Sequence, residues 1–172
     1  MASGVNEHRG TEKVATHAIQ NRFRHISTDP ITVLQQIDDT FTQQGQESRY
    51  HGFDTMAASV LVNDVSGKSI DHIFYEKVFA RLGAESKLIW WADRNGNALG
   101  DTGLNLVPRD WARVGQYLVN EMRADSCIGS FLKEGLERAM PTDRVPELAY
   151  GYFFWVLPSD TQPLVVLYGR GG

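Results

Sequence analysis

The sequence predicts an α+β fold in which an antiparallel or mixed sheet of about five strands packs against about five helices. Apolar residues recur at helical spacing in several segments, and strand-like segments end at turn residues. The dipeptide Asn95-Gly96 is the residue pair that best supports a tight type I′ hairpin turn. Hydrophobic residues make up 42% of the chain and charged residues 22%, which is ordinary for a globular protein.

Length and cysteine content predict one domain in a reducing compartment. The 172 residues fit a single core, which we expect over residues 11–172, after a flexible segment at residues 1–10. Cys127 is the only cysteine, so no internal disulfide can form. The first residues carry no apolar leader, and the longest apolar stretch is too short to cross a bilayer. We therefore expect a cytoplasmic protein that does not enter a membrane.

Five helices are expected from apolar spacing and from start and stop residues. The first carries Ala15, Ile19, Phe23 and Ile26 at helical spacing. The second runs from Asp29-Pro30 to Gly45. The third covers residues 70–82, with Ser66 or Ser69 as its cap and Gly83 as its stop. The fourth begins at Pro108, and the fifth runs from residue 128 to Met140 before Pro141.

The expected strands are rich in β-branched and aromatic residues. One covers residues 57–62, and two more, at residues 87–94 and 97–107, form a hairpin around Asn95-Gly96 with Gly100 and Gly103 as bulges. A central strand covers residues 148–157 because it is apolar on both faces. It pairs with residues 164–168 in a second hairpin at the end of the chain.

Charge argues against nucleic acid as a partner. The formal net charge is −4, and binding to a phosphate backbone needs clustered lysine and arginine. We therefore do not expect nucleic-acid binding, and no motif in the sequence indicates a cofactor.

Metal binding is not expected either. No two histidines stand four residues apart on one helix, and Cys127 has no cysteine partner. Asp93, Asn95, Asn97 and Asp101 alternate like calcium ligands, but Ala98 and Leu104 replace the glycine and the glutamate that a calcium loop needs.

Cys127 is the sharpest candidate for chemistry. The run Asp125-Ser126-Cys127 begins a helix, where free backbone N–H groups and the helix dipole favour a thiolate. A catalytic thiol also needs a base, for which His72 and His51 are the candidates. This alternative would make the chain a small thiol-dependent enzyme.

Aromatic residues gather in the second half of the chain. Trp90 and Trp91 are adjacent, so on a strand they face opposite sides and one of them can be exposed. Exposed tryptophan and tyrosine side chains often anchor a partner. The expected binding residues are Trp90, Trp91, Trp111, Tyr152 and Trp155.

The sequence hypothesis for function is a non-enzymatic intracellular binding or regulatory protein. It would be a regulator, an adaptor or an immunity-type inhibitor that uses an acidic surface and exposed aromatic residues. We expect a protein partner and consider a homodimer, since self-pairing is a common way to cover an apolar patch. Two alternatives stay open: the thiol enzyme at Cys127 and a small-ligand sensor with an aromatic pocket.

Overall fold

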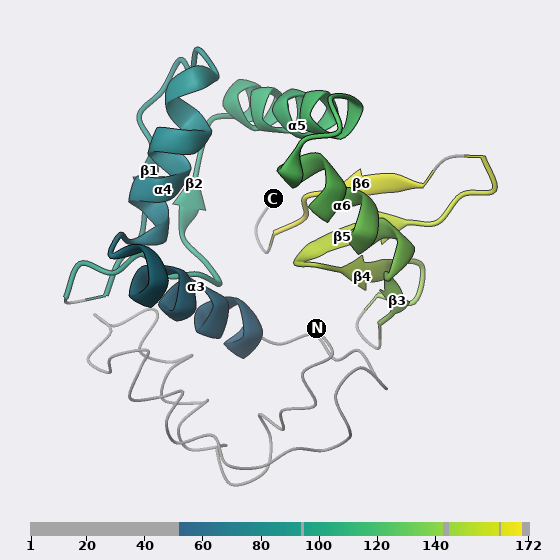
Figure 1. The fold of residues 1–172 in the computed structure, drawn as a ribbon, viewed down its shortest axis with the longest axis horizontal. Coiled ribbons are helices and arrows are strands. Elements are labelled where there is room, and N and C mark those ends of the chain that lie inside the picture. Colours follow the sequence, from purple (N-terminus) through teal and green to yellow (C-terminus); the bar gives the residue numbers. More distant parts are fainter. Residues whose placement is uncertain (1–51, 94, 143–144, 162, 170–172) are drawn as a thin grey trace, which may run out of the picture. The chain divides into compact units, whose positions relative to one another are not determined.

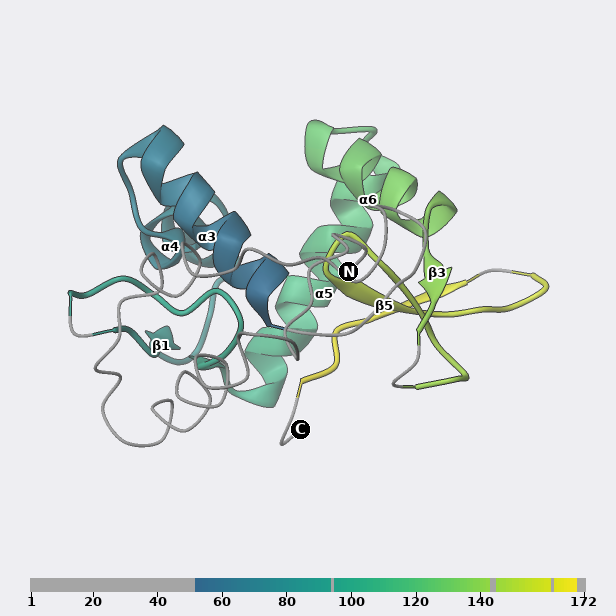
Figure 2. The same cartoon turned by 90° about the horizontal axis from the view of Figure 1, so that it is seen from below.

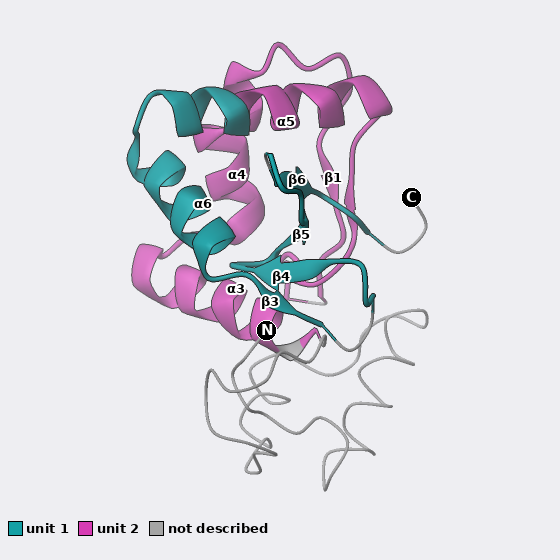
Figure 3. Ribbon diagram, turned by 90° about the vertical axis from the view of Figure 1, so that its right-hand side faces the viewer, with its two compact units in different colours: residues 1–5, 40–51, 118–172 teal, residues 6–39, 52–117 magenta. Residues whose placement is uncertain are grey.

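The structure is a computed structural model that describes residues 52–93, 95–142, 145–161 and 163–169. The flexible segment and the two helices expected before residue 46 lie outside these residues. The described chain combines helices with antiparallel sheets, so the predicted α+β class is confirmed. The described chain forms two compact units: residues 52–117 belong to one, and the described residues from 118 onward belong to the other (Figure 3).

The unit formed by residues 52–117 begins with helix α3 (Phe53–Ser66) and helix α4 (Ile70–Lys77), both labelled in Figure 1. The short 3₁₀ helix η1 (Phe79–Arg81) follows them. Gly67 ends α3 with a left-handed φ of 68° and donates its N–H to the carbonyl of Asn63. The strand predicted at residues 57–62 is therefore wrong. These residues lie inside a helix that buries Met56 and leaves Val65 exposed.

The predicted hairpin is confirmed, but its turn differs. Strands β1 (Ile89–Trp90) and β2 (Leu104–Asn105) pair antiparallel, and Ala92 bridges Ala98. Gly96 has a φ of 83°, whereas Asn95 has no positive φ, so the turn is not type I′. The carboxylate of Asp93 shapes it instead by accepting the N–H groups of Asn95 at 2.8 Å and Asn97 at 2.9 Å.

Helices α5 (Pro108–Arg123) and α6 (Cys127–Glu137) begin where the sequence predicts them. The hydroxyl of Ser126 caps α6 by accepting the N–H of Gly129 at 3.0 Å. The helix ends at Glu137, so its predicted extension to Met140 is wrong. Met140 and Pro141 form strand β3 instead.

A four-stranded meander follows, with strands β3 (Met140–Pro141), β4 (Ala149–Gly151), β5 (Phe154–Leu157) and β6 (Leu164–Val166) in sequence order. The segment 148–157, predicted as one strand, is two strands joined by a turn at Tyr152-Phe153. The predicted hairpin at the end of the chain is confirmed by the pairing of β5 with β6.

The core of this second unit lies between α6 and the sheet, which Figure 2 shows from below. Leu132 from α6 packs against Phe154 and Val156 from β5. Helix and strand approach closely where Gly135 faces Gly151, because a Cβ on Gly151 would collide with the carbonyl oxygen of Gly135. Two glycines therefore set the distance between α6 and β4.

Candidate functional site

A pocket of about 440 Å³ opens in the unit formed by residues 52–117. Helix α4, η1 and the segment before β1 form its walls. Its lining combines acidic, basic, hydroxyl and apolar side chains: Asp71, His72, Tyr75, Phe79, Ser86, Lys87 and Leu88.

Aromatic rings form the apolar part of this pocket. Phe79 is buried on η1, and its ring lies 6.1 Å from that of Tyr75 at a tilt of 35°. The ring of Phe74 lies 6.3 Å from that of Phe79, and it packs against Trp90 at 5.9 Å in a T-shaped arrangement. The aromatic surface of the pocket is therefore backed by packed side chains.

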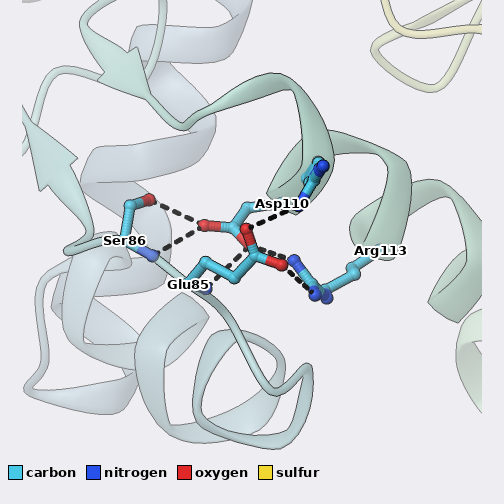
Figure 4. A network of polar contacts seen from close by, with 5 residues as sticks. Glu85, Ser86, Asp110 and Arg113 are labelled. Carbon is cyan, nitrogen blue, oxygen red and sulfur yellow. Dashed lines mark hydrogen bonds and ion pairs between the residues drawn. The ribbon is translucent and has the colours of Figure 1, made fainter.

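Asp110 fixes the wall that carries Ser86 and Lys87. Its fully buried carboxylate accepts the backbone N–H groups of Glu85 and Ser86, each at 3.0 Å, and the Ser86 hydroxyl at 2.7 Å. Arg113 donates to the same carboxylate at 2.7 Å and to Glu85, also at 2.7 Å (Figure 4). Because four donors converge on one carboxylate, the segment before β1 is held in one conformation.

These contacts determine the charge of the network. The Ser86 hydroxyl and the Glu85 amide lower the pKa of Asp110 to about 2, against the opposing effect of burial. Glu85 and Asp110 raise the pKa of Arg113. Because its pKa is low, Asp110 stays ionised and is a weak base. It therefore accepts the hydrogen bond from the Ser86 hydroxyl without removing the proton. The Asp110 network serves positioning rather than proton transfer.

The sequence analysis did not single out Asp110, Tyr75 or Lys87. A signal for Asp110 was present, because an acidic residue in the first turn of a helix, three residues before an arginine, is typical of a helix start. Its partners stand 24 and 25 residues earlier in the chain, and no local pattern links them.

The predicted catalytic candidates lie on different elements, and their pairing stays a prediction. His72 lines the pocket, whereas Cys127 is exposed at the first residue of α6 in the other unit. His51 lies outside the described residues. Residues 118–172 contain no histidine.

The predicted aromatic binding residues occupy different environments. Trp90 is half-buried and its Nε1 donates to the carbonyls of Leu99 and Thr102, whereas the adjacent Trp91 is 46% exposed. The two neighbouring side chains therefore differ in exposure, and their predicted placement on opposite sides stays a prediction.

Trp111 is half-buried on α5, and Tyr152 is half-buried in the turn between β4 and β5. Trp155 is only 4% exposed and meets Tyr150 edge-on at 4.9 Å, so it is part of the core. Among the five tryptophan and tyrosine candidates, Trp91 is the one whose side chain is largely open to solvent.

The turn at Tyr152-Phe153 has an unusual backbone. Both residues have positive φ angles, 42° and 71°, which L side chains rarely adopt. Tyr152 stacks on Phe131 at 4.8 Å, and a hydrogen bond with Glu134 raises the pKa of its phenol. Phe153 is 47% exposed.

Within the described residues, no group of three or more histidine, cysteine or acidic side chains could hold a metal ion. The Asp93 carboxylate is occupied by its own turn, as the hydrogen bonds from Asn95 and Asn97 show. No helix in the part of the chain that the structure describes is long and apolar enough to cross a membrane.

No family model matches the sequence, and no curated protein matches it. Two solved structures are similar to the chain over 92% of its length. One is a penicillin binding protein from Bacillus halodurans, with a TM-score of 0.60 and 14% identity. The other is a D-stereospecific amidohydrolase from Streptomyces sp., with a TM-score of 0.59 and 13% identity. The chain covers 54% and 55% of these two, or about half their length, and the likeness is one of fold.

This likeness corrects the functional hypothesis. The prediction of a non-enzymatic regulator, adaptor or inhibitor acting by protein binding is contradicted, because the chain shares its fold with an amidohydrolase and a penicillin binding protein. Neither neighbour is named as a thiol enzyme or a ligand sensor, so those alternatives gain no support. The missing motifs misled the prediction, because a fold can carry chemistry that no short motif reveals.

One sequence spacing bears on nucleophilic chemistry. A serine nucleophile can be paired with a lysine three residues later, in a Ser-x-x-Lys motif. The only such spacing in this sequence joins Ser130 to Lys133, on α6. Both residues are exposed, and the Lys133 ammonium forms an ion pair with Asp125, whose pKa it lowers. An ammonium held by a carboxylate has no lone pair to accept the serine proton, so this pair is not arranged for nucleophilic attack.

Proposed function

We propose that this chain belongs to an enzyme that cleaves amide bonds by acyl transfer. The observation that supports the proposal is the similarity of 92% of the chain, at TM-scores of 0.60 and 0.59, to the two solved structures. The names of both proteins refer to amide chemistry, because penicillin contains a cyclic amide and an amidohydrolase cleaves an amide bond. The expected substrate class is an amide whose carbonyl carbon reacts with an enzyme nucleophile.

The test measures both halves of acyl transfer on the full chain. A fluorescent penicillin would report covalent acylation by a label that survives denaturing electrophoresis. The p-nitroanilides of D- and L-phenylalanine would report turnover by release of p-nitroaniline. We expect covalent labelling, or release that is faster for the D substrate than for the L substrate. Labelling and release no greater than with heat-inactivated protein would contradict the proposal.

Two serine variants accompany this test. Ser130→Ala should keep the activity of the natural chain, because Lys133 is engaged by Asp125. Ser159→Ala changes another exposed serine and serves as the matched control. Loss of activity in Ser130→Ala alone would assign the nucleophile to Ser130 and show that the ion pair opens during reaction.

The remaining sequence expectations become proposals of the same kind. We propose a cytoplasmic protein that has a protein partner and can pair as a homodimer, built as one α+β domain with about five strands and five helices. Light scattering after size-exclusion chromatography tests the homodimer directly.

A further inference from the structure

The pocket in the unit formed by residues 52–117 carries both signs of charge around an aromatic surface. Asp71 supplies a carboxylate from the first turn of α4, and Lys87 supplies an ammonium from the segment before β1. His72 lies beside Asp71 on the same helix, while Tyr75 and Phe79 provide the aromatic rings. A ligand that satisfies the whole lining has a cationic group, an anionic group and an apolar part.

The size of the pocket restricts the ligand further. A volume of about 440 Å³ lies in the lower part of the range for small-molecule sites, which is about 300–1,000 Å³. A single small molecule fits that range, and Asp71 and Lys87 would have to bind the two ends of the same molecule. A free α-amino acid carries its ammonium and carboxylate on one carbon atom, and its side chain extends from that carbon.

The Asp110 network prepares one side of the pocket before a ligand arrives. Asp110 binds the backbone of Glu85 and Ser86, directly before Lys87 and Leu88 in the chain. Binding therefore need not order this backbone, and that lowers the entropic cost of association. The other side is helical, because Asp71, His72 and Tyr75 all lie on α4.

We propose that this pocket binds a free amino acid with an apolar or aromatic side chain. The ligand ammonium faces Asp71, its carboxylate faces Lys87 and His72, and its side chain lies against Tyr75 and Phe79. The site is an addition to the proposed amide-cleaving activity and does not depend on it, since no bond is made or broken in the pocket.

The experiment is a titration of the isotope-labelled full chain, followed by NMR, with phenylalanine of either configuration. Two analogues measure the contribution of each charged group to binding: phenethylamine lacks the carboxylate, and 3-phenylpropionate lacks the ammonium. We expect phenylalanine to bind at millimolar concentrations and each analogue about fivefold more weakly, as the loss of one exposed charge pair implies. The largest shifts should fall on α4 and residues 86–88. Absence of saturable binding, or equal affinity for all three compounds, would overturn the proposal.

Variants of the protein test whether Lys87 binds the ligand carboxylate and Asp71 binds the ligand ammonium. Lys87→Ala and Asp71→Asn should each weaken phenylalanine binding about fivefold. Lys77→Ala and Asp64→Asn remove exposed charges of the same sign outside the pocket lining and should change nothing. Because Asp71 contacts the Ser69 hydroxyl at the start of α4, its substitution can affect folding, and Lys87→Glu provides the second test.

Lys87→Glu should reverse the preference between the analogues, so that phenethylamine binds better than 3-phenylpropionate. An unchanged preference would overturn the assignment of the carboxylate to Lys87. The titration measures binding without turnover, so its failure leaves the amide-cleavage proposal intact, and failure of the amide assays leaves this one intact.

Discussion

At the scale of single residues, the clearest strain lies in the turn between β4 and β5. Tyr152 and Phe153 both adopt the left-handed region, which costs an L residue about 1–2 kcal/mol. Two-residue hairpin turns of this kind usually carry Asn-Gly. Two aromatic residues gave no turn signal, so the sequence predicted one strand across them. The stacking of Tyr152 on Phe131 and its hydrogen bond with Glu134 help to hold the turn.

The strain at Phe153 can be measured by comparing two truncations. Phe153→Gly and Phe153→Ala both remove the half-exposed ring, but only glycine relaxes a φ of 71°. We expect the glycine variant to be more stable than the alanine variant by about 1 kcal/mol, the cost of a left-handed L residue. Urea unfolding measures the difference. Equal stability would mean that the turn changes conformation when the ring is removed.

At the scale of elements, local sequence signals predicted where helices begin better than they predicted whether a segment is a helix or a strand. Pro108 and Ser126 correctly mark the starts of α5 and α6, because a cap or a proline acts on its own first turn. The run from Ala57 to Val62 favoured a strand by composition but lies in α3, since helix propensity differs little between residues and tertiary packing overrides it. Periodicity could not separate a short apolar strand from part of a helix.

The surroundings of two helical glycines predict opposite effects for the same substitution to alanine. Gly129→Ala places a Cβ against the backbone carbonyl of Glu121, which cannot rotate away, whereas a Cβ at Gly115 meets nothing within 4 Å. We expect Gly129→Ala to lose about 2 kcal/mol of stability through overpacking. Gly115→Ala should gain up to about 1 kcal/mol from helix propensity.

Chemical denaturation of both glycine variants decides between packing and propensity. If Gly129→Ala is as stable as Gly115→Ala, the approach of α6 to the end of α5 is looser than the structure indicates.

At the scale of the whole molecule, apolar spacing and turn residues were enough to predict the α+β class but not the function. Apolar fraction and turn spacing reflect packing, which every globular chain needs. The pocket depends on residues from α4 and from the segment before β1, and Asp110 on α5 binds the backbone of that segment. His72 was named from the sequence as a base candidate, yet its pocket neighbour Lys87 becomes visible only once the chain is folded.

The stability of the whole chain at acid pH tests the contribution of the ionised Asp110 carboxylate. The Asp110 carboxyl has its pKa lowered from 3.8 to about 2, so it binds a proton more readily in the unfolded chain than in the folded one. Its contribution to stability is therefore complete above about pH 4 and is lost as the pH falls toward 2.

The comparison is between the natural chain and Asp110→Asn in thermal melts from pH 2 to pH 7. Asp110→Asn should melt at least about 5 °C lower at neutral pH, because Arg113 loses a buried charged partner. Between pH 4 and pH 2 the two melting temperatures should converge, since protonation removes the same charge from the natural chain. Asp125→Asn changes an exposed pair with Lys133 and should shift the melting temperature by about 2 °C at most. Parallel curves for the natural chain and Asp110→Asn across this range would show that the stability of the fold does not depend on the ionised form of Asp110.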